Sequence, residues 1–354
     1  MRSRCVPQAS FIRNHWYVAA LSGEVADRPV GFTVLDEPIV LFRDTAGAVI
    51  ALEDRCVHRQ APLSLGTVLG DRLQCGYHGF TYDRTGACVL VPSQDRIPPN
   101  AAVRAYPVRE RQGMVFVWTG DPALSRTREP YDFPYAEGGA YAEGGEWSVH
   151  TARLYGRFDY RLLIDNLLDL SHLSFAHKST IGAAGLARGD DTTTERDGVK
   201  VTVTRWMPDI EQAPAHVEIT GHVGRIDRWQ VIEFTPPGFI WLQVGTAKAG
   251  RGGRDAAPGD ILLDRHALHV MTPETAATTH YLWVMAIRAG ALSAEQEKIL
   301  LDRSIQAFNE DITIIEGQQS RLDADRANVD VGADAGQLAG RRLLERLIAQ
   351  DAAR

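Results

Sequence analysis

The stretch "CVHRQAPLSLGTVLGDRLQCGYH", residues 56–78, carries the pattern that decides the fold of the first part of the chain. It contains Cys56-x-His58 and, after 16 further residues, Cys75-x-x-His78. Four such side chains could hold a zinc ion, hold an iron–sulfur cluster, form a disulfide or be unconnected. The spacing and the surrounding sequence distinguish between these possibilities.

The mixed Cys/His pairs favour an iron–sulfur cluster over structural zinc. Structural zinc sites usually pair like with like, typically with about two to four residues between two cysteines. In a Rieske [2Fe–2S] centre, two thiolates bind one iron and two imidazoles bind the other. Two loops that each bring one Cys and one His supply that ligand set. We therefore expect Cys56, His58, Cys75 and His78 to bind a [2Fe–2S] cluster, with zinc as the main alternative.

Composition excludes several other classes. The 354 residues are 44 % hydrophobic and 23 % charged with a net charge of −7, which fits a globular protein without a basic nucleic-acid surface. No apolar run reaches the roughly 18 residues that span a bilayer. The start "MRSRCVPQAS" lacks the apolar core of a signal peptide. We expect a cytoplasmic protein that binds neither nucleic acid nor membrane, with Cys5 and Cys88 as bystanders.

The first third of the chain has the pattern of short strands. Residues 29–56, "PVGFTVLDEPIVLFRDTAGAVIALEDRC", alternate apolar and polar positions between turn signals, and "GMVFVWTGDP" is a further strand with a turn. This predicts a small antiparallel β-sandwich or barrel. Residues 120–146, rich in Pro, Gly and charge, have the composition of a linker. We expect one domain over 1–135, with the first ten or so residues as an extension, and a second over 136–354.

The second domain mixes helices and strands. Residues 158–180, "FDYRLLIDNLLDLSHLSFAHKST", carry apolar residues at helical spacing without Gly or Pro, and residues 196–290 return to strand-like runs. Helical patterns resume from Ser293 and end in "GRRLLERLIAQ". These alternations predict an α+β domain in which helices cover an antiparallel sheet.

The two cluster loops resemble those of one known family. "DRCVHRQAPLSLG" and "LQCGYHGFTYD" are similar to the loops of Rieske-type oxygenases. Respiratory-chain Rieske proteins carry an additional cysteine in each loop, where this chain has Ala61 and Tyr77. The similarity runs essentially end to end, and is greatest to the vanillate O-demethylase oxygenase and dicamba monooxygenase group. It implies a catalytic domain of the helix-grip, START-like type.

A second metal site is indicated in "IDNLLDLSHLSFAH", where His172 and His177 lie five residues apart. On an ideal helix they would diverge by about 140°, so the helix must bend or end between them to serve one ion. Taken alone, the pair is more typical of ordinary helix-end histidines than of a metal site. The family resemblance implies that both bind a mononuclear non-heme Fe(II). It places the third ligand in "AFNEDITIIEG", where Asp311 fits best and Glu310 and Glu316 are alternatives.

The resemblance also implies roles for three further residues. Asp169 corresponds to the carboxylate that links the mononuclear iron to the Rieske cluster of a neighbouring subunit, which implies a homotrimer. Asn166 corresponds to a position near the iron. His269, in "HVMTPE", could hydrogen-bond a substrate carboxylate, although the pattern by itself favours an ordinary sheet histidine.

The implied function is that of a terminal oxygenase in a multicomponent monooxygenase. No G-x-G-x-x-G precedes a helix and no second cysteine cluster is present, so NAD(P)H, flavin and any ferredoxin centre belong to a separate reductase. With O2, such an enzyme would O-demethylate or hydroxylate a vanillate-like aromatic acid, releasing formaldehyde from methoxy substrates. N-demethylation and ring or methyl hydroxylation use the same sites. The non-enzymatic alternative is a Rieske electron carrier or binding protein.

Overall fold

The computed structural model describes residues 11–136, 146–178, 180–182, 192–323 and 325–353. These residues fold into two compact units, one formed by residues 11–132 with 272–276 and one by the rest. The boundary predicted between residues 135 and 136 stays a prediction. Cys5 and the predicted N-terminal extension lie outside the described residues.

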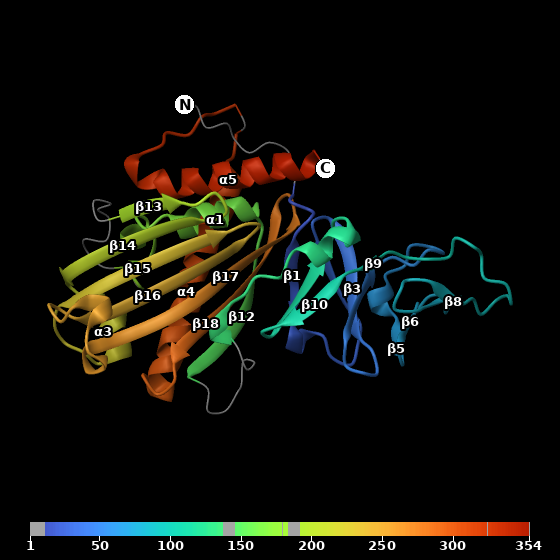
Figure 1. Ribbon diagram of the computed structural model, residues 1–354, viewed down its shortest axis with the longest axis horizontal. Helices are drawn as coiled ribbons and strands as arrows, with labels where there is room; N and C mark the ends of the chain where they lie inside the picture. The colour runs from blue at the N-terminus through green and yellow to red at the C-terminus, as the bar shows by residue number, and fades with distance from the viewer. Residues whose placement is uncertain (1–10, 137–145, 179, 183–191, 324, 354) are drawn as a thin grey trace. The chain divides into compact units, whose positions relative to one another are not determined.

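The first unit is all-β, as predicted, and consists of three small antiparallel sheets (Figure 1). The first sheet contains β1 (Trp16–Leu21), β11 (Met114–Trp118) and β10 (Val108–Arg111). The second contains β2 (Val30–Val34), β3 (Glu37–Arg43), β4 (Val49–Glu53) and β9 (Ala105–Tyr106). The third contains β5 (Thr67–Leu69), β6 (Arg72–Gln74), β7 (Thr81–Tyr82) and β8 (Cys88–Leu90).

The third sheet positions the two cysteine loops. One loop connects β4 to β5 and the other connects β6 to β7, so both emerge at the same small sheet. Cys56 and Cys75 belong to a hydrophobic cluster that also contains Leu63, Leu73 and Tyr82. The loops are therefore anchored by burial of their own cysteines rather than by long strands.

The second unit is an antiparallel sheet of seven strands with helices, which confirms the predicted α+β class (Figure 1). In sheet order the strands are β12 (Trp147–Gly156), β18 (Thr278–Arg288), β17 (Ile261–Thr275), β16 (Phe239–Lys248), β15 (Ile226–Thr235), β14 (Val201–Ile210) and β13 (Thr192–Arg196). The helices are α1 (Tyr160–Leu168), α2 (Leu173–Ala176), α3 (Pro214–Thr220), α4 (Ala294–Gln319) and α5 (Ala335–Ala352). Its short 3-10 helices are η4 (Pro134–Ala136), η5 (Gly253–Asp255), η6 (Pro258–Asp260) and η7 (Gly332–Asp334), whereas η1 (Ser22–Glu24), η2 (Leu63–Leu65) and η3 (Pro122–Thr127) belong to the first unit.

Helix α4 lies against one face of the sheet, which we call the inward face. The helix begins at Ser293, whose hydroxyl accepts the Gln296 N–H while the Gln296 side chain accepts the Ser293 N–H. Its buried stripe includes Ser304, Phe308 and Asp311, spaced four and three residues apart. The Phe308 ring contacts aromatic side chains of β17 and β18, which fixes the helix on the sheet.

The helix predicted over residues 158–180 ends twice, once earlier than expected and once between the two histidines. Helix α1 ends at Leu168, and His172 and His177 flank the single turn of α2. The end of α2 after Ala176 lies between the two histidines, as predicted, whereas the earlier break at Asp169 was not predicted. The Asp169 carboxylate accepts the Ser171 N–H at 2.6 Å, and this local hydrogen bond competes with continuation of the helix.

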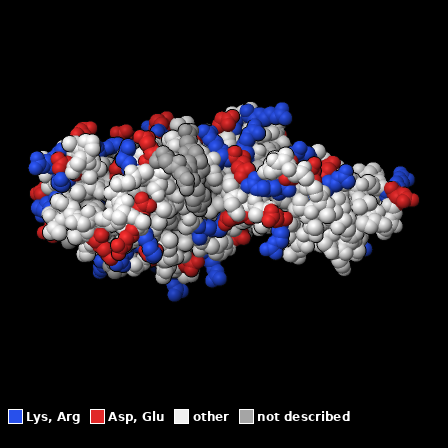
Figure 2. All heavy atoms as spheres, turned by 90° about the horizontal axis from the view of Figure 1, so that it is seen from below, with Lys and Arg blue, Asp and Glu red and all other residues white. Residues whose placement is uncertain are grey.

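On the face shown in Figure 2, basic and acidic side chains are interspersed. None of the described helices is long and apolar enough to cross a membrane.

We expect Gly336→Leu to destabilise the second unit. A Cβ on Gly336 would lie 2.7 Å from Val203 Cγ2 and 3.2 Å from the Leu168 carbonyl oxygen, where α5 approaches α1 and β14. Overpacking there should lower the free energy of unfolding by about 1–3 kcal/mol, measured by thermal denaturation. The control Gly317→Leu, in α4, meets nothing within 4 Å and should be neutral or slightly stabilising. Equal stability of both variants would contradict the close packing of α5.

Candidate metal centres

The two cysteine loops share one backbone arrangement. The Cys56 N–H donates to the Ala61 carbonyl and the Cys75 N–H donates to the Phe80 carbonyl, each at 2.8 Å. In both cases the acceptor lies five residues after the cysteine. Each loop therefore closes on itself and holds its cysteine at a fixed place beside the third sheet.

The residue four positions after each cysteine also occupies a matching place in the two loops. The Cys56 carbonyl accepts the Gln60 N–H at 2.8 Å, and the Cys75 carbonyl accepts the Gly79 N–H at 3.1 Å. Gln60 and Gly79 both have left-handed backbone conformations, with φ of 58° and 72°. Glycine adopts this conformation readily, whereas Gln60 does so at a steric cost that the loop must offset. The two halves of the site are thus related by an approximate repeat.

The cysteines and histidines are segregated by burial. Cys56 and Cys75 are 1 % and 2 % exposed, whereas the His58 and His78 rings are exposed and their centroids lie 4.5 Å apart. Two thiols at the core and two imidazoles at the surface match the two ends of a Rieske cluster, which binds one iron through each pair.

The protonation states of these groups follow from their surroundings. Burial raises the pKa of the Cys75 thiol, although backbone N–H groups of Tyr77 and His78 oppose the shift. Partial desolvation lowers the pKa of His58, helped by the neighbouring charges of His78 and Arg59. The neutral imidazole is the form that binds metal, whereas a thiol must first lose its proton.

Tyr82 is a contact of the cluster loops that the sequence pattern did not single out. Its hydroxyl lies 3.1 Å from Cys56 Sγ and accepts the Val57 N–H at 3.2 Å. Burial, followed by the Cys56 neighbour, raises the pKa of Tyr82, so the phenol stays protonated and can donate to the sulfur. Hydrogen bonds to cluster sulfurs are one of the means by which a protein sets the reduction potential.

The second candidate centre brings together His172, His177 and Asp311. One possible ligand atom from each lies within 4.8 Å of the others. Asp311 Oδ1 is 3.5 Å from His172 Nε2 and 3.2 Å from His177 Nε2. Two imidazoles and one carboxylate on one side of a metal are the ligand set of non-heme Fe(II) oxygenases. The geometry therefore fits the expected iron.

The two alternative carboxylates have other contacts. Glu310 Oε2 lies 2.8 Å from His177 Nδ1 and also accepts the Thr180 hydroxyl at 2.9 Å. This bond keeps the proton on Nδ1 and leaves Nε2 for a metal. Glu316 accepts the Arg157 N–H at 2.9 Å. Glu310 therefore orients a candidate ligand, and Asp311 fits the ligand position.

Asn166 reaches the same group from α1. Its Nδ2 donates to Asp311 Oδ1 at 3.0 Å, and its own Oδ1 has no hydrogen-bond partner among the described residues. Burial opposes a charge on His177, but the carboxylates of Asp311 and Glu310 outweigh it and raise the pKa of that imidazole. A metal ion entering here would displace the proton.

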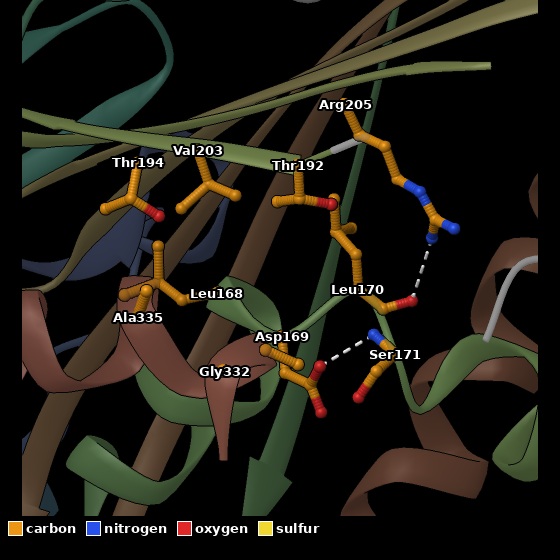
Figure 3. A pocket seen from close by; sticks show the side chains of 11 residues that line it. Leu168, Asp169, Leu170, Ser171, Thr192, Thr194, Val203, Arg205, Gly332 and Ala335 are labelled. Atoms are coloured by element: carbon orange, nitrogen blue, oxygen red, sulfur yellow. Dashed lines mark hydrogen bonds between the residues drawn. The ribbon is translucent and has the colours of Figure 1, made fainter. Parts of the chain in front are cut away.

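Asp169 lies beside this group without belonging to it. Its Oδ2 is 3.7 Å from His172 Nδ1, too long for a hydrogen bond. Burial would raise the pKa of Asp169, but the nearby His172 ring and the Ser171 donors lower it, so the carboxylate stays ionised. Figure 3 shows the adjoining cavity of about 40 Å³, large enough for water. Its lining residues are Leu168, Asp169, Leu170, Ser171, Thr192, Thr194, Val203, Arg205, Gly332, Ala333 and Ala335.

His269 lies on the inward face of β17, close to α4. It is fully buried, its Nδ1 lies 2.6 Å from the Tyr281 hydroxyl, and its ring meets Phe308 edge-on at 5.2 Å. Burial and then the charge of Arg265 lower the pKa of His269 to about 3, so the ring is neutral. Its Nε2 has no hydrogen-bond partner among the described residues. Phe308 and Asp311 share the buried stripe of α4, so His269 faces the region next to the candidate iron site.

The fold and these two sites define a Rieske non-heme iron oxygenase. Residues 15–107 match the family model of the Rieske [2Fe–2S] domain, and residues 157–350 match that of the vanillate O-demethylase oxygenase C-terminal domain. The chain belongs to this family of oxygenase components. Its cofactors are accordingly a Rieske [2Fe–2S] cluster and a mononuclear non-heme iron, with O2 as co-substrate.

Individual relatives are similar to this chain over almost its whole length. The iron–sulfur subunit of a toluene-4-sulfonate monooxygenase system from Comamonas testosteroni is 38 % identical, over 96 % of this chain and 97 % of the relative. A vanillate O-demethylase oxygenase subunit from a Pseudomonas species is 35 % identical, over 96 % of both. A crystal structure of dicamba monooxygenase with non-heme iron and dicamba has a TM-score of 0.79 and 29 % identity, covering 98 % of this chain and all of that chain.

We expect Glu310→Gln to weaken iron binding. The amide can still accept from His177 Nδ1 but lacks the negative charge that increases the basicity of the imidazole. Loss of such a supporting carboxylate should lower iron affinity roughly 10- to 100-fold, measured by competition with a chelator. Glu316→Gln, on the same helix, is the control and should keep the affinity of the unmodified protein. Similar affinities for both variants would mean that Glu310 does not support a metal ligand.

Proposed function

We propose that the chain inserts one oxygen atom from O2 into a C–H bond of a methoxy or methyl group of a small aromatic acid. The other oxygen atom leaves as water, formed with two protons and two electrons from the reductase. The observation that carries this proposal is the preassembled group of two imidazoles and one carboxylate. Its Asp311 lies on the buried stripe of α4 beside Phe308, whose ring contacts the neutral imidazole of His269. A hydroxylated methoxy carbon is a hemiacetal, which collapses to a phenol and formaldehyde. We favour a vanillate-like methoxybenzoate over N-methyl compounds as the substrate class, because the second domain matches the vanillate O-demethylase family model.

The chain divides the electron pathway between its two domains. We assign Cys56 and Cys75 to one iron of the cluster and His58 and His78 to the other. This assignment is supported by the burial of both thiols and the exposure of both imidazoles. When bound, the cluster supplies single electrons and the mononuclear iron supplies oxygen activation.

The residues of the second centre would hold and orient the mononuclear iron. We assign His172, His177 and Asp311 as its ligands, supported by the short separations between their ligand atoms. Asn166 holds Asp311 through its amide, and Glu310 holds His177 through Nδ1. Both contacts restrict rotation of a ligand before the metal arrives.

His269 would position the substrate. With the Tyr281 hydroxyl donating to Nδ1, the proton of the neutral ring resides on Nε2. That N–H can donate to a substrate oxygen near the iron. A fixed hydrogen bond of this kind selects which carbon faces the metal and thereby contributes to catalysis by orientation.

We further propose a homotrimer in which the cluster of one subunit reduces the iron of the next, with Asp169 as the link. An ionised carboxylate next to His172 can accept an N–H from an incoming histidine of the partner subunit. The proposal is supported by apolar side chains exposed around both centres. They are Val57, Leu65 and Tyr77 beside the cluster loops, and Phe175 and Ile314 beside the iron group, each 42–77 % exposed.

The electrons would come from a separate reductase that oxidises NAD(P)H through a flavin. Because NAD(P)H is supplied in the cytoplasm, we place the protein there. The proposal is tested by combining purified holoenzyme with such a reductase and measuring O2 uptake and formaldehyde for 4-methoxybenzoate and vanillate. The holoenzyme should contain roughly three irons and two acid-labile sulfides per chain. Zinc without sulfide, or no formaldehyde from any methoxybenzoate, would refute the proposal.

His172→Ala separates an oxygenase from an electron carrier. The variant should lose one of the three irons and reduce formaldehyde formation to background, because two ligands hold the metal poorly. The visible spectrum of the [2Fe–2S] cluster should be unchanged. Iron content, absorbance and turnover are measured on the same preparation. Turnover at the original rate would rule out His172 as an iron ligand.

Mixed trimers test the transfer between subunits. A His58→Ala chain lacks a complete cluster and a His172→Ala chain lacks the iron, so each alone should be inactive. Trimers purified with a tag on each chain contain one productive cluster–iron pair, and should recover about one third of the original turnover. Adding Asp169→Asn to the His58→Ala chain should abolish this recovery, whereas adding it to the His172→Ala chain should not. No recovery in mixed trimers would contradict transfer between subunits.

A further inference from the structure

Two buried arginines on the inward face of the sheet have no acidic partner in the described part of the chain. Arg228 on β15 and Arg265 on β17 are 8 % and 9 % exposed. No described carboxylate lies within ion-pair distance, 4.0 Å, of either guanidinium. Their acidic neighbours in sequence, Asp227 and Asp264, project to the opposite face because side chains alternate along a strand.

The register of the sheet brings the polar side chains of this region together. Arg265 is opposite Val244 on β16, and Val244 is opposite Gln230 on β15, so these residues share the inward face. Arg228 lies two residues before Gln230 and therefore on the same face. Arg228 Nε, Arg265 Nε and the side-chain amide oxygen of Gln230 lack hydrogen-bond partners among the described residues. The fold thus aims unused donors into the interior.

The position of the pair relative to the candidate iron site follows from α4. Arg265 Nη1 donates to the Ser304 hydroxyl at 3.3 Å. Ser304 and Asp311 lie on the same buried stripe, seven residues apart, which is about 10 Å along the helix axis. An aromatic acid whose reacting group is on the far side of the ring spans a comparable length. The guanidinium groups therefore stand at the end of the inward face away from the metal ligands.

Both arginines remain charged at neutral pH despite their burial. Desolvation, followed by the charges of Arg265 and Arg205, lowers the pKa of Arg228 to about 10, and desolvation lowers the pKa of Arg265 to about 10. Burial, followed by the charges of Arg228 and Arg265, lowers the pKa of the nearby His216 to about 3. A buried charge without a partner is strongly unfavourable, and several such charges together attract an anion.

We propose that Arg228 and Arg265 bind the carboxylate or sulfonate group of the aromatic substrate. The inference rests on the proposed function, because it names the acidic group of that substrate. Guanidinium groups form paired, charge-assisted hydrogen bonds with such anions. The neutral His269, closer to the metal ligands, donates a hydrogen bond to another substrate oxygen and cannot neutralise the acid. Anchoring at one end and orientation at the other place the reacting carbon at the iron.

The test compares acids with a neutral analogue of the same shape. Dissociation constants of the holoenzyme are measured for 4-methoxybenzoate, 4-toluenesulfonate and 4-methoxybenzamide by equilibrium dialysis, and KM values by O2 uptake. Arg228→Met and Arg265→Met should each weaken binding of both acids roughly 10- to 100-fold. Binding of the neutral amide should change little. Arg265→Lys should retain part of the affinity, because lysine keeps the positive charge but cannot donate two parallel hydrogen bonds to one anion.

Arg225→Met is the control, since Arg225 adjoins β15 but is exposed and pairs with Asp209. It should leave all three dissociation constants unchanged. Equal losses for acids and amide in the buried-arginine variants would show a structural role and overturn the inference. If the variants do not fold, the unmodified holoenzyme decides, because equal affinity for 4-methoxybenzoate and its amide would also overturn it.

These results separate the inference from the function on which it rests. Selective loss of acid binding without oxidation of any compound would retain the anion site and refute the monooxygenase proposal. Oxidation of methoxybenzoates with no preference for the acids over the amide would retain the monooxygenase proposal and refute the anion site. Preference for only one of the two acids, lost in both variants, would retain the site and identify the acid group that it takes.

Discussion

Asp311 must be held between the imidazoles of His172 and His177, which lie 139 and 134 residues earlier in the chain. The carboxylate is only 5 % exposed, and burial of an ionised group is costly unless hydrogen bonds or opposite charges compensate it. Here the Asn166 amide and the His172 and His177 rings provide that compensation. The site therefore exists only where α1 and α2 pack against α4, and the long sheet serves to hold these helices in place.

The segment that carries these histidines satisfies this requirement because its helix ends twice, first at Leu168 in α1 and again at Ala176 in α2, between the two histidines. If the helix continued through His172 and His177, their side chains would point about 140° apart and could not share one ion. The Asp169 carboxylate binds the Ser171 N–H and ends the helix, so one residue both breaks the helix and presents a charge beside His172. Close approach of α5 at Gly336 then fixes the end of α1 near Leu168. Backbone geometry and the candidate electron link are thus determined together.

Much of this arrangement could be predicted from local pattern, because its signals are local. The Cys56/His58 and Cys75/His78 spacing, the strand alternation and the long helix from Ser293 each depend on neighbouring residues. The choice of Asp311 over Glu310 could not be derived in this way, since adjacent helical residues differ by about 100° and only packing shows which one faces inward. Spacing alone predicted the end of the helix between the two histidines but not the earlier break, because it does not reveal the turn at Asp169.

The residues that pattern missed depend on which face of the sheet each strand presents. Tyr82 contacts Cys56 across 26 residues, and Tyr281 contacts His269 from the neighbouring strand. In β18 nearly every residue is buried, so alternation cannot separate an inward from an outward side chain. Register is a property of paired strands, and it becomes visible only in the folded sheet.

The same register explains how one largely apolar face of the sheet keeps the candidate metal ligands apart from the buried arginines. Helix α4 contacts both groups, since it contributes Asp311 to the candidate metal ligands and, two turns away, Ser304 as the acceptor for the buried Arg265. Between them lie Phe308 and the neutral His269, which carry no charge to neutralise either end. Opposite charges therefore stay separated along the helix instead of collapsing into a buried salt bridge. A ligand that is anionic at one end and apolar at the other matches this polarity, and a reversed orientation would place its acid group against Asp311.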